Sequence, residues 1–296
     1  MKRHGCFYRM TRTRLIGLFR MFRFELPFAA GVCVLLAELL ALGSLPSLRQ
    51  AVAGFLCLFF ISSSALILND CFDVETDRIN APERPLPAGL VTKVEAVTLS
   101  FFVALLGCCS AFLLGPEAFM ICCIVWLLGF LYNWRFKKYG LAGNLFVAVP
   151  VGMSFVFGGV AVGNLSEPLV WFMGVWVFGV DLGEEVAADA LDVEGDRKTG
   201  SRSLAVLYGP QKAMRMAAGI FAVVVAGSAL PFLSGWLAWQ YLPPVAVFDV
   251  LIVHSVRRLL DSRIPDRIND IRRIYLDGTG MILVLIVIRL VMARRG

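Results

Sequence analysis

Long apolar stretches recur along the whole chain and alternate with short polar segments that are rich in Arg and Lys. About nine of them are long enough to cross a bilayer, because roughly 20 apolar residues in a helix span its hydrocarbon core. These stretches lie at residues 26–43, 51–69, 95–114, 118–134, 141–163, 168–188, 213–233, 237–254 and 277–293. The sequence lacks the alternating pattern of barrel strands. It therefore predicts an all-α, polytopic membrane protein with nine transmembrane helices.

Composition and charge agree with this interpretation. Hydrophobic residues make up 58% of the 296 residues and charged residues only 17%, with a mean hydropathy of +0.76. Soluble domains are nearer about 45–50% apolar. The net charge of +6 is explained by orientation in the membrane and by contact with anionic membrane lipids. No nucleic-acid-binding module is visible, so we expect no nucleic acid among the partners.

Basic side chains collect in alternate polar segments. Segment 1–23 and the loops after the second, fourth, sixth and eighth apolar stretches carry most of the Arg and Lys residues. The positive-inside rule places these segments on the cytoplasmic side. We therefore expect a multi-pass protein of the cell membrane with a cytoplasmic N-terminus.

The same acidic pattern follows the second and the sixth apolar stretch. FDVETDRIN runs from Phe72 to Asn80, and LDVEGDRKT runs from Leu191 to Thr199. Their alignment matches two triplets of aspartates 119 positions apart, which are Asp70, Asp73 and Asp77 with Asp189, Asp192 and Asp196. If the segments are helical, the i, i+3, i+7 spacing projects each triplet from one face. Four crossings separate the triplets, so both reach the same side of the membrane and can converge.

Two self-repelling carboxylate triplets persist most readily where cations neutralise them, and oxygen-only ligands favour Mg²⁺. At a membrane surface, such a site suits a substrate with a lipid tail and a diphosphate head, which Mg²⁺ would bridge to the carboxylates. The tail would then occupy the apolar bundle. Five cationic side chains lie in the same polar segments, namely Arg78, Lys137, Lys138, Arg197 and Lys198, and Asn69 adds a neutral hydrogen-bonding group.

Three segments resemble motifs of the UbiA superfamily of intramembrane prenyltransferases. NDCFDVETDRINAPERPLPAG, from Asn69 to Gly89, resembles the first Asp-rich motif, NDxxDxxxD, and DALDVEGDRKTGSRSLAV, from Asp189 to Val206, resembles the second. LYNWRFKKYGLAGN, residues 131–144, is similar to the tyrosine and basic loop between them. The resemblance covers nearly the whole chain and implies one UbiA-like bundle around a central cavity. We expect a basic cytoplasmic segment at 1–23 and pseudo-repeat halves at about 24–140 and 141–296.

The resemblance implies Mg²⁺-dependent transfer of an isoprenyl group from a prenyl diphosphate to a lipophilic acceptor, at a site on the cytoplasmic face. It assigns catalysis and the binding of Mg²⁺ to Asp70, Asp73, Asp77, Asp192 and Asp196. It assigns substrate binding to Asn69, Arg78, Tyr132, Lys137, Glu185, Asp189, Arg197 and Lys198. Tyr132 either lines the prenyl tunnel or lies at the membrane interface, and Glu185 is an intramembrane acid of the kind that faces a bundle interior. Glu25 either orients the acceptor or pairs with Arg23.

The acceptor is less well defined by the motifs. The form DVEGDRKxG resembles archaeal-type geranylgeranylglyceryl phosphate geranylgeranyltransferases, which implies geranylgeranyl diphosphate as donor and a glycerol-phosphate lipid precursor as acceptor. Those enzymes usually carry Arg-Glu and Lys-Asp pairs where this chain has Glu184-Glu185 and Ala188-Asp189, so two expected cations are missing. An aromatic quinone or a tetrapyrrole therefore stays open as acceptor. Val74, in a position where hydroxybenzoate-type members commonly have Arg, disfavours hydroxybenzoate.

Two other classes of membrane protein use acidic clusters. An ion-coupled transporter would hold its acids near the middle of the bilayer on broken helices, whereas these aspartates lie at the ends of the apolar stretches. A phosphotransferase acting on CDP-linked alcohols would need a DGxxAR element, which the sequence lacks. Prenyl transfer is therefore the predicted function, with the transporter as the alternative from another class.

Overall fold

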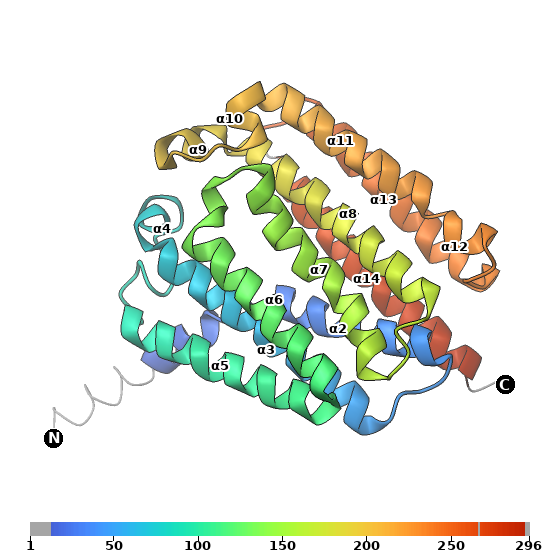
Figure 1. Cartoon of the computed structure of the whole chain (residues 1–296). Helices are drawn as coiled ribbons and strands as arrows, with labels where there is room; N and C mark the ends of the chain where they lie inside the picture. The colour runs from blue at the N-terminus through green and yellow to red at the C-terminus, as the bar shows by residue number, and fades with distance from the viewer. Residues whose placement is uncertain (1–12, 266, 294–296) are drawn as a thin grey trace, which may run out of the picture.

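Helices and the loops between them make up the described part of the protein, which is residues 13–265 and 267–293 of a computed structural model. The helices pack side by side as a bundle (Figure 1). A first helical segment covers residues 13–20. The long helices are α2 (Glu25–Leu42), α3 (Leu48–Phe72), α5 (Lys93–Leu114), α6 (Pro116–Trp134), α7 (Leu141–Ala161), α8 (Pro168–Leu191), α11 (Pro210–Gly227), α13 (Leu242–Leu260) and α14 (Ile268–Ala293). The all-α prediction is confirmed.

Short helices connect the long ones. They are α4 (Val74–Asn80), η1 (Phe136–Lys138), α9 (Val193–Thr199), α10 (Leu204–Tyr208), α12 (Leu230–Leu233) and η2 (Trp239–Tyr241). Four of them, α4, η1, α9 and α10, follow the ends of α3, α6 and α8. The polar segments that carry the predicted site are therefore folded into short helices rather than extended loops.

Within residues 13–265 and 267–293, seven helical segments are long and apolar enough to cross a membrane, and they confirm a multi-pass membrane protein. They are Glu25–Leu42, Leu48–Phe72, Lys93–Leu114, Pro116–Trp134, Leu141–Ala161, Pro210–Leu233 and Ile268–Met292. The helices α8 and α13 overlap the sixth and eighth predicted stretches but fall outside this group, because each carries three or more charged side chains. Length and hydropathy therefore do not confirm the predicted count of nine crossings.

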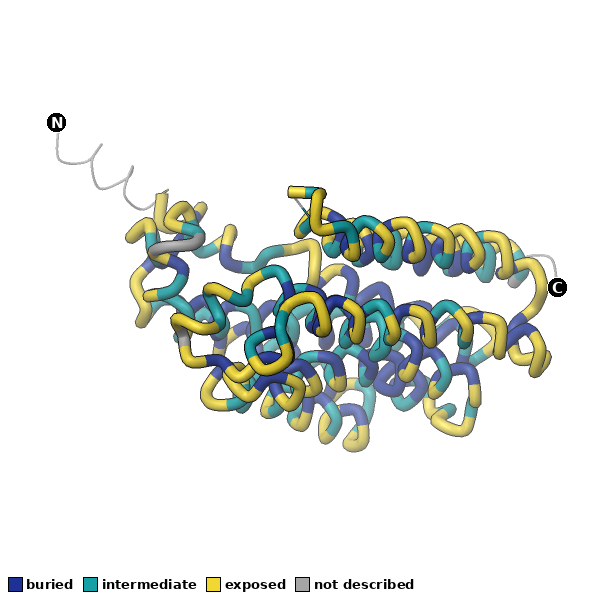
Figure 2. The backbone as a smooth tube through the Cα atoms, turned by 90° about the horizontal axis from the view of Figure 1, so that it is seen from above, coloured by how far each residue is buried: buried dark blue, intermediate teal, exposed yellow. Residues whose placement is uncertain are grey.

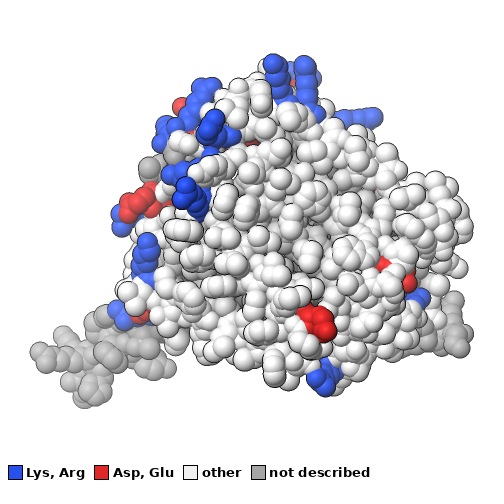
Figure 3. Space-filling model, viewed as in Figure 1, with Lys and Arg blue, Asp and Glu red and all other residues white. Residues whose placement is uncertain are grey.

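The outer surface of the bundle suits a lipid environment. Buried and exposed positions alternate along the helices (Figure 2), and large apolar side chains such as Phe112 and Val223 are 71% and 73% exposed. Arg and Lys side chains gather mainly at one end, near α4 and α9, and leave the lateral face seen in Figure 3 almost uncharged. An apolar belt with charges at one end is the distribution that a bilayer requires.

Glycines allow the central helices to pack closely. A Cβ atom on Gly152 of α7 would lie 2.6 Å from the carbonyl oxygen of Gly174 in α8, and a Cβ atom on Gly174 would lie 3.0 Å from the carbonyl oxygen of Gly152. On its other side, a Cβ atom on Gly158 of α7 would lie 2.5 Å from the Cβ of Ala37 in α2. Membrane helices associate through such small residues because lipid provides no hydrophobic driving force between them. The helix α7 is thus held between α2 and α8.

Both Asp-rich segments break their helices at the middle aspartate. Asp73 (φ −92°, ψ 4°) lies between α3 and α4, and Asp192 (φ −109°, ψ 31°) lies between α8 and α9. In each case the backbone N–H of this aspartate donates to the carbonyl oxygen four residues before it, in the preceding helix. Its own carbonyl oxygen accepts from the N–H four residues after it, in the next helix, and all four N···O distances are 2.8–3.0 Å. Each triplet is therefore divided over two successive helices, with its middle aspartate between them.

Helices in the two parts of the chain also have bounds at equivalent positions. The ends of α3 and α8, and both bounds of α4 and α9, differ by the same 119 positions as the aspartates, and so do the ends of α2 and α7. Equal spacing over three helix pairs is expected if one half of the chain repeats the other. It supports the proposal of two related halves.

The glycine contact between α7 and α8 gives a prediction about stability. Gly152→Ala should lower the melting temperature of the purified protein by roughly 2–8 °C, because the added methyl group overpacks the interface. Gly219→Ala in α11 is the matched control, since a Cβ there has open space and alanine favours helix. Thermal unfolding in detergent measures both variants. Equal melting temperatures for the two would contradict the close packing.

Candidate functional site

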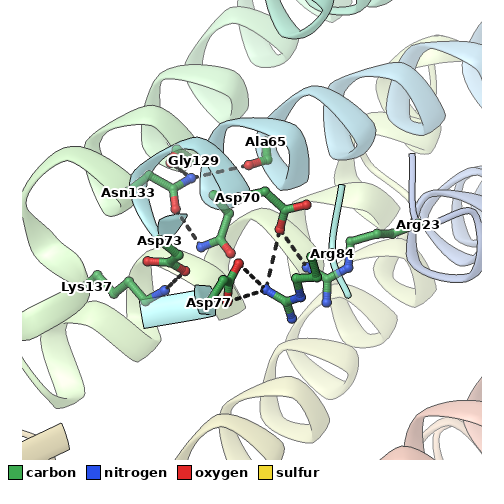
Figure 4. A network of polar contacts seen from close by, with 10 residues as sticks. Arg23, Ala65, Asp70, Asp73, Asp77, Arg84, Gly129, Asn133 and Lys137 are labelled. Carbon is green, nitrogen blue, oxygen red and sulfur yellow. Dashed lines mark hydrogen bonds and ion pairs between the residues drawn. The ribbon is translucent and has the colours of Figure 1, made fainter. Parts of the chain in front are cut away.

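Two of the three aspartates in the first triplet, Asp70 and Asp77, are paired with arginines that lie outside the helices. Arg84 Nη1 donates to both carboxylate oxygens of Asp77, at 2.8 and 2.7 Å. Asp70 is 3% exposed, and its Oδ1 lies 3.6 Å from Nη1 of both Arg84 and Arg23 (Figure 4). Burial lowers the pKa of Arg84, but the hydrogen bonds to Asp77 and the negative charges of Asp77, Asp70 and Asp73 together raise it above its usual value. The site thus combines buried carboxylates with guanidinium groups.

Arg23 reaches Asp70 through an unusual backbone conformation. It has φ 46° and is the only residue other than glycine with a positive φ in the described ranges. This conformation costs about 1–3 kcal/mol and persists where the surrounding structure enforces it. Here it redirects the chain between the helical segment 13–20 and α2. The turn allows Arg23 to face Asp70.

Lys137 links the two motifs. Its ammonium group pairs with Asp73 (Figure 4), and η1 supplies this lysine from the loop after α6. Lys137 also lies within electrostatic range of Asp196 and Glu185. The two acidic motifs therefore meet around one basic side chain, at the end of the bundle where α4 and α9 lie in Figure 1.

The second triplet is held mainly by neutral groups. Asn144 of α7 donates from Nδ2 to Asp189 Oδ2 at 2.9 Å. Asp196 bonds with the side chains of Ser203 and Ser201, and its pKa is raised by burial although these hydrogen bonds oppose the rise. Asp192 is exposed. Its carboxylate packs closely against Gly195, because a Cβ atom on Gly195 would be 2.5 Å from the Oδ1 of Asp192. The orientation of the Asp192 carboxylate thus depends on a glycine.

The basic loop docks directly onto the second motif. The N–H of Arg202 donates to the carbonyl oxygen of Lys138 at 2.9 Å. Gly140, with φ 56°, lies so close that a Cβ atom there would be 2.1 Å from the carbonyl oxygen of Arg202. Only glycine suits this position, because it needs both a left-handed backbone and a close approach. Gly140 therefore holds the loop of Lys137 against the segment that follows α9.

The predicted residues Tyr132 and Glu185 lie between the motifs. Tyr132 of α6 is within electrostatic range of Glu185, Asp73, Asp189 and Asp181. Glu185 in turn lies near Asp181, Asp189 and Lys137. Side chains from both halves of the chain therefore lie near one another, a tyrosine of α6 with several acids of α8 and the first motif.

Three predicted cations, Arg78, Arg197 and Lys198, are exposed at the surface. Arg78 pairs with Glu75 on the exposed side of α4, at 2.8 Å, and Arg197 and Lys198 are exposed on α9. The alternative that Glu25 pairs with Arg23 is wrong. Glu25 instead pairs with Arg272 of α14 at 2.9 Å, because Arg23 turns toward Asp70.

Four residues at the site escaped the sequence-based assignment. Arg23, Arg84, Asn133 and Asn144 contact the motifs but were not among the predicted site residues. Three of them lie within the segments that carry the family resemblance, which was the available signal. Arg23 lies outside those segments, and its contact depends on the backbone turn described above.

The side-chain atoms that the site offers as ligands suit a divalent cation. All six motif side chains offer oxygen, which Mg²⁺ prefers, and the buried Oδ1 of Asp70 has no hydrogen-bond partner. Among residues 13–265 and 267–293, no group of three or more acidic, His or Cys side chains surrounds one point closely enough to form a complete metal site. Asp73 and Asp77 are paired with Lys137 and Arg84 instead. The same cations are suited to phosphate oxygens.

The fold and the site define a multi-pass membrane protein with paired acidic motifs and converging cations at one end. The chain belongs to the UbiA prenyltransferase family, which matches residues 30–276, and it is a prenyltransferase as the resemblance implied. Digeranylgeranylglyceryl phosphate synthase from Thermococcus gammatolerans is 33% identical over 239 residues, covering 80% of this chain and 86% of the relative.

Solved structures have the same fold. A structure of digeranylgeranylglyceryl phosphate synthase is 26% identical, with a TM-score of 0.71, and the match covers 95% of this chain and 98% of that one. A UbiA homologue from Archaeoglobus fulgidus bound to GPP and Mg²⁺ is 21% identical, with a TM-score of 0.66, and the match covers 90% of this chain and 99% of that one. The predicted fold class and family are therefore confirmed.

The docking of the basic loop gives a prediction about activity. Gly140→Ala should lower the rate of pyrophosphate release from geranylgeranyl diphosphate on the order of 100-fold, because small displacements of positioning groups have effects of this size. Gly163→Ala is the matched control, since Gly163 also has a left-handed backbone, with φ 72°, but open space around its Cβ position. Equal rates for the two variants would show that the contact with Arg202 is unimportant.

Proposed function

We propose that this protein uses Mg²⁺ to transfer a prenyl group from a prenyl diphosphate to a lipophilic acceptor at the cytoplasmic face of the cell membrane. The meeting of the two acidic motifs around Lys137 carries this proposal. Family membership and the apolar bundle beneath the motifs support it. The basic segments at the same end support a cytoplasmic site, by the positive-inside rule.

Each group of residues has a distinct task in this reaction. Five aspartates, Asp70, Asp73, Asp77, Asp192 and Asp196, would hold Mg²⁺, with Asn69 and Asp189 beside them. When bound, Mg²⁺ neutralises the diphosphate oxygens and makes pyrophosphate a better leaving group. Lys137, Arg84 and Arg23 neutralise the charge that remains on the diphosphate.

Catalysis then follows from charge stabilisation and the exclusion of water. As the bond between the allylic C1 and the diphosphate oxygen lengthens, negative charge grows on the leaving group, where Lys137 and Arg84 stabilise it. The nucleophilic atom of the acceptor forms its new bond to C1 while pyrophosphate leaves. The apolar helices around the prenyl tail exclude water, which suppresses hydrolysis of the donor.

For the substrates, we propose geranylgeranyl diphosphate as donor and a glycerol-phosphate lipid precursor as acceptor. The form of the second motif supports this choice, as does the similarity to proteins named digeranylgeranylglyceryl phosphate synthase. An aromatic quinone or tetrapyrrole acceptor is the second candidate. Acidic side chains with unpaired buried oxygens on α8, at Asp181 and Glu184, favour it because they would repel a phosphorylated acceptor.

The metal-binding assignment predicts a sharp contrast between motif aspartates and a neighbouring acid. Asp73→Ala and Asp192→Ala should each lower turnover by at least about 100-fold, because an interaction that stabilises the transition state is lost. Glu194→Ala is the matched control, since Glu194 is also exposed and lies two positions from Asp192. Pyrophosphate release at saturating Mg²⁺ measures all three. Near-normal turnover in either aspartate variant would overturn the assignment.

The choice of acceptor is tested by product analysis. Incubation with geranylgeranyl diphosphate and a mixture of geranylgeranylglyceryl phosphate, quinone precursors and chlorophyllide should give a doubly prenylated glycerol phosphate, identified by mass spectrometry. A prenylated aromatic product alone would favour the second candidate. No pyrophosphate release from geranylgeranyl diphosphate or from prenyl diphosphates of other chain lengths would favour a transporter.

A further inference from the structure

Asn133 of α6 is buried behind the first motif, with 8% of its surface exposed. Its side-chain nitrogen donates to two backbone carbonyl oxygens, that of Gly129 at 3.0 Å and that of Ala65 at 3.3 Å (Figure 4). Its side-chain oxygen accepts a hydrogen bond from Nδ2 of Asn69 at 2.8 Å. Asn133 therefore connects α6 to the residue that precedes Asp70.

This chain of hydrogen bonds determines which way each amide points. A carbonyl oxygen only accepts, so the atom of Asn133 that faces Gly129 and Ala65 must be the nitrogen. Its oxygen is then directed at Asn69, and the atom of Asn69 that meets it must be a donor. Asn69 is thus held by its nitrogen. Its own oxygen has no hydrogen-bond partner among the described residues and remains available as a ligand.

Orientation matters because the two ends of an amide act in opposite ways on a cation. A side-chain oxygen is a good ligand for a hard divalent ion, whereas an N–H group directed at the ion repels it. Asn69 adjoins Asp70 and lies one helical turn before Asp73. The backbone N–H of Asp73 donates to the backbone carbonyl oxygen of Asn69 at 2.9 Å. A rotation of the Asn69 amide by half a turn would exchange a ligand for a repelling group.

We propose that Asn133 is a positioning residue that keeps the side-chain oxygen of Asn69 available to the divalent cation of the first motif. The inference rests on the proposed Mg²⁺-dependent function and deepens it. Asn133 itself touches neither the metal nor the substrate. It acts only through the orientation of Asn69, as partners of metal ligands commonly do.

The test measures metal binding directly. Mn²⁺ is titrated into the full-length protein and followed by electron paramagnetic resonance, in the presence of the unreactive donor analogue geranylgeranyl S-thiolodiphosphate. Asn133→Leu and the smaller Asn133→Ala should each weaken Mn²⁺ binding by roughly 10-fold or more, as loss of a ligand's partner does. Thermal unfolding shows whether each variant is folded. If only one of them is folded, its Mn²⁺ affinity alone provides the test.

Two further variants separate positioning from a structural role. Asn133→Asp still accepts from Asn69 but cannot donate to Gly129 or Ala65, so it should lower the melting temperature while leaving Mn²⁺ affinity within about twofold of the original protein or tighter. The double variant Asn69→Asp with Asn133→Leu should recover most of the lost affinity, because both ends of a carboxylate are oxygens and its rotation is harmless.

The matched control lies at the other end of the bundle. Asn164 also donates its amide to a backbone carbonyl oxygen, that of Ala41 at 2.7 Å, and Asn164→Leu should leave Mn²⁺ affinity unchanged. Original affinity in Asn133→Leu, or no recovery in the double variant, would overturn the role of Asn133 while the proposed function stands. Failure of the folded, unaltered protein to bind Mn²⁺ with the analogue would overturn both.

Discussion

Repulsion between carboxylates is the constraint around which this end of the protein is organised. Two triplets of aspartates lie where an apolar bundle ends, and Asp70 and Asp77 are almost completely buried. Charges in such surroundings destabilise the fold unless partners compensate them. Arg84 and Lys137 supply compensation at the first motif. Because the same cations suit phosphate oxygens, the arrangement that stabilises the fold also prepares the site for a diphosphate.

The helix packing decides where these charges meet. The glycine contacts hold α7 between α2 and α8, and the helix breaks at Asp73 and Asp192 turn α4 and α9 away from the helices before them. The loop of Lys137 then bridges the two halves through the contact between Gly140 and Arg202. A site built from two distant segments therefore depends on close backbone approaches between the helices and at the loop of Lys137.

Each motif is also held by an asparagine from a neighbouring helix. Asn133 of α6 holds Asn69, and Asn144 of α7 holds Asp189. Amides suit this task because they orient a neighbouring group without adding charge to an already acidic site. In the first motif the held group is itself an amide, so its orientation decides whether oxygen or nitrogen is presented. In the second motif the held group is a carboxylate, for which the two ends are equivalent.

The sequence by itself determined the membrane class, the all-α fold, the paired acidic motifs and the family, because hydrophobic length and motif spacing are local properties of the chain. Only the tertiary structure decided that each triplet is broken at its middle aspartate. It also decided that Arg23 and Arg84, rather than Arg78, face the buried carboxylates. These partners depend on the direction of a turn and on helix packing. The contact of Arg23 joins segments distant in sequence, so no local pattern encodes it, whereas Arg84 lies only seven positions from Asp77 and the fold of the loop after α4 decides that it faces the aspartates.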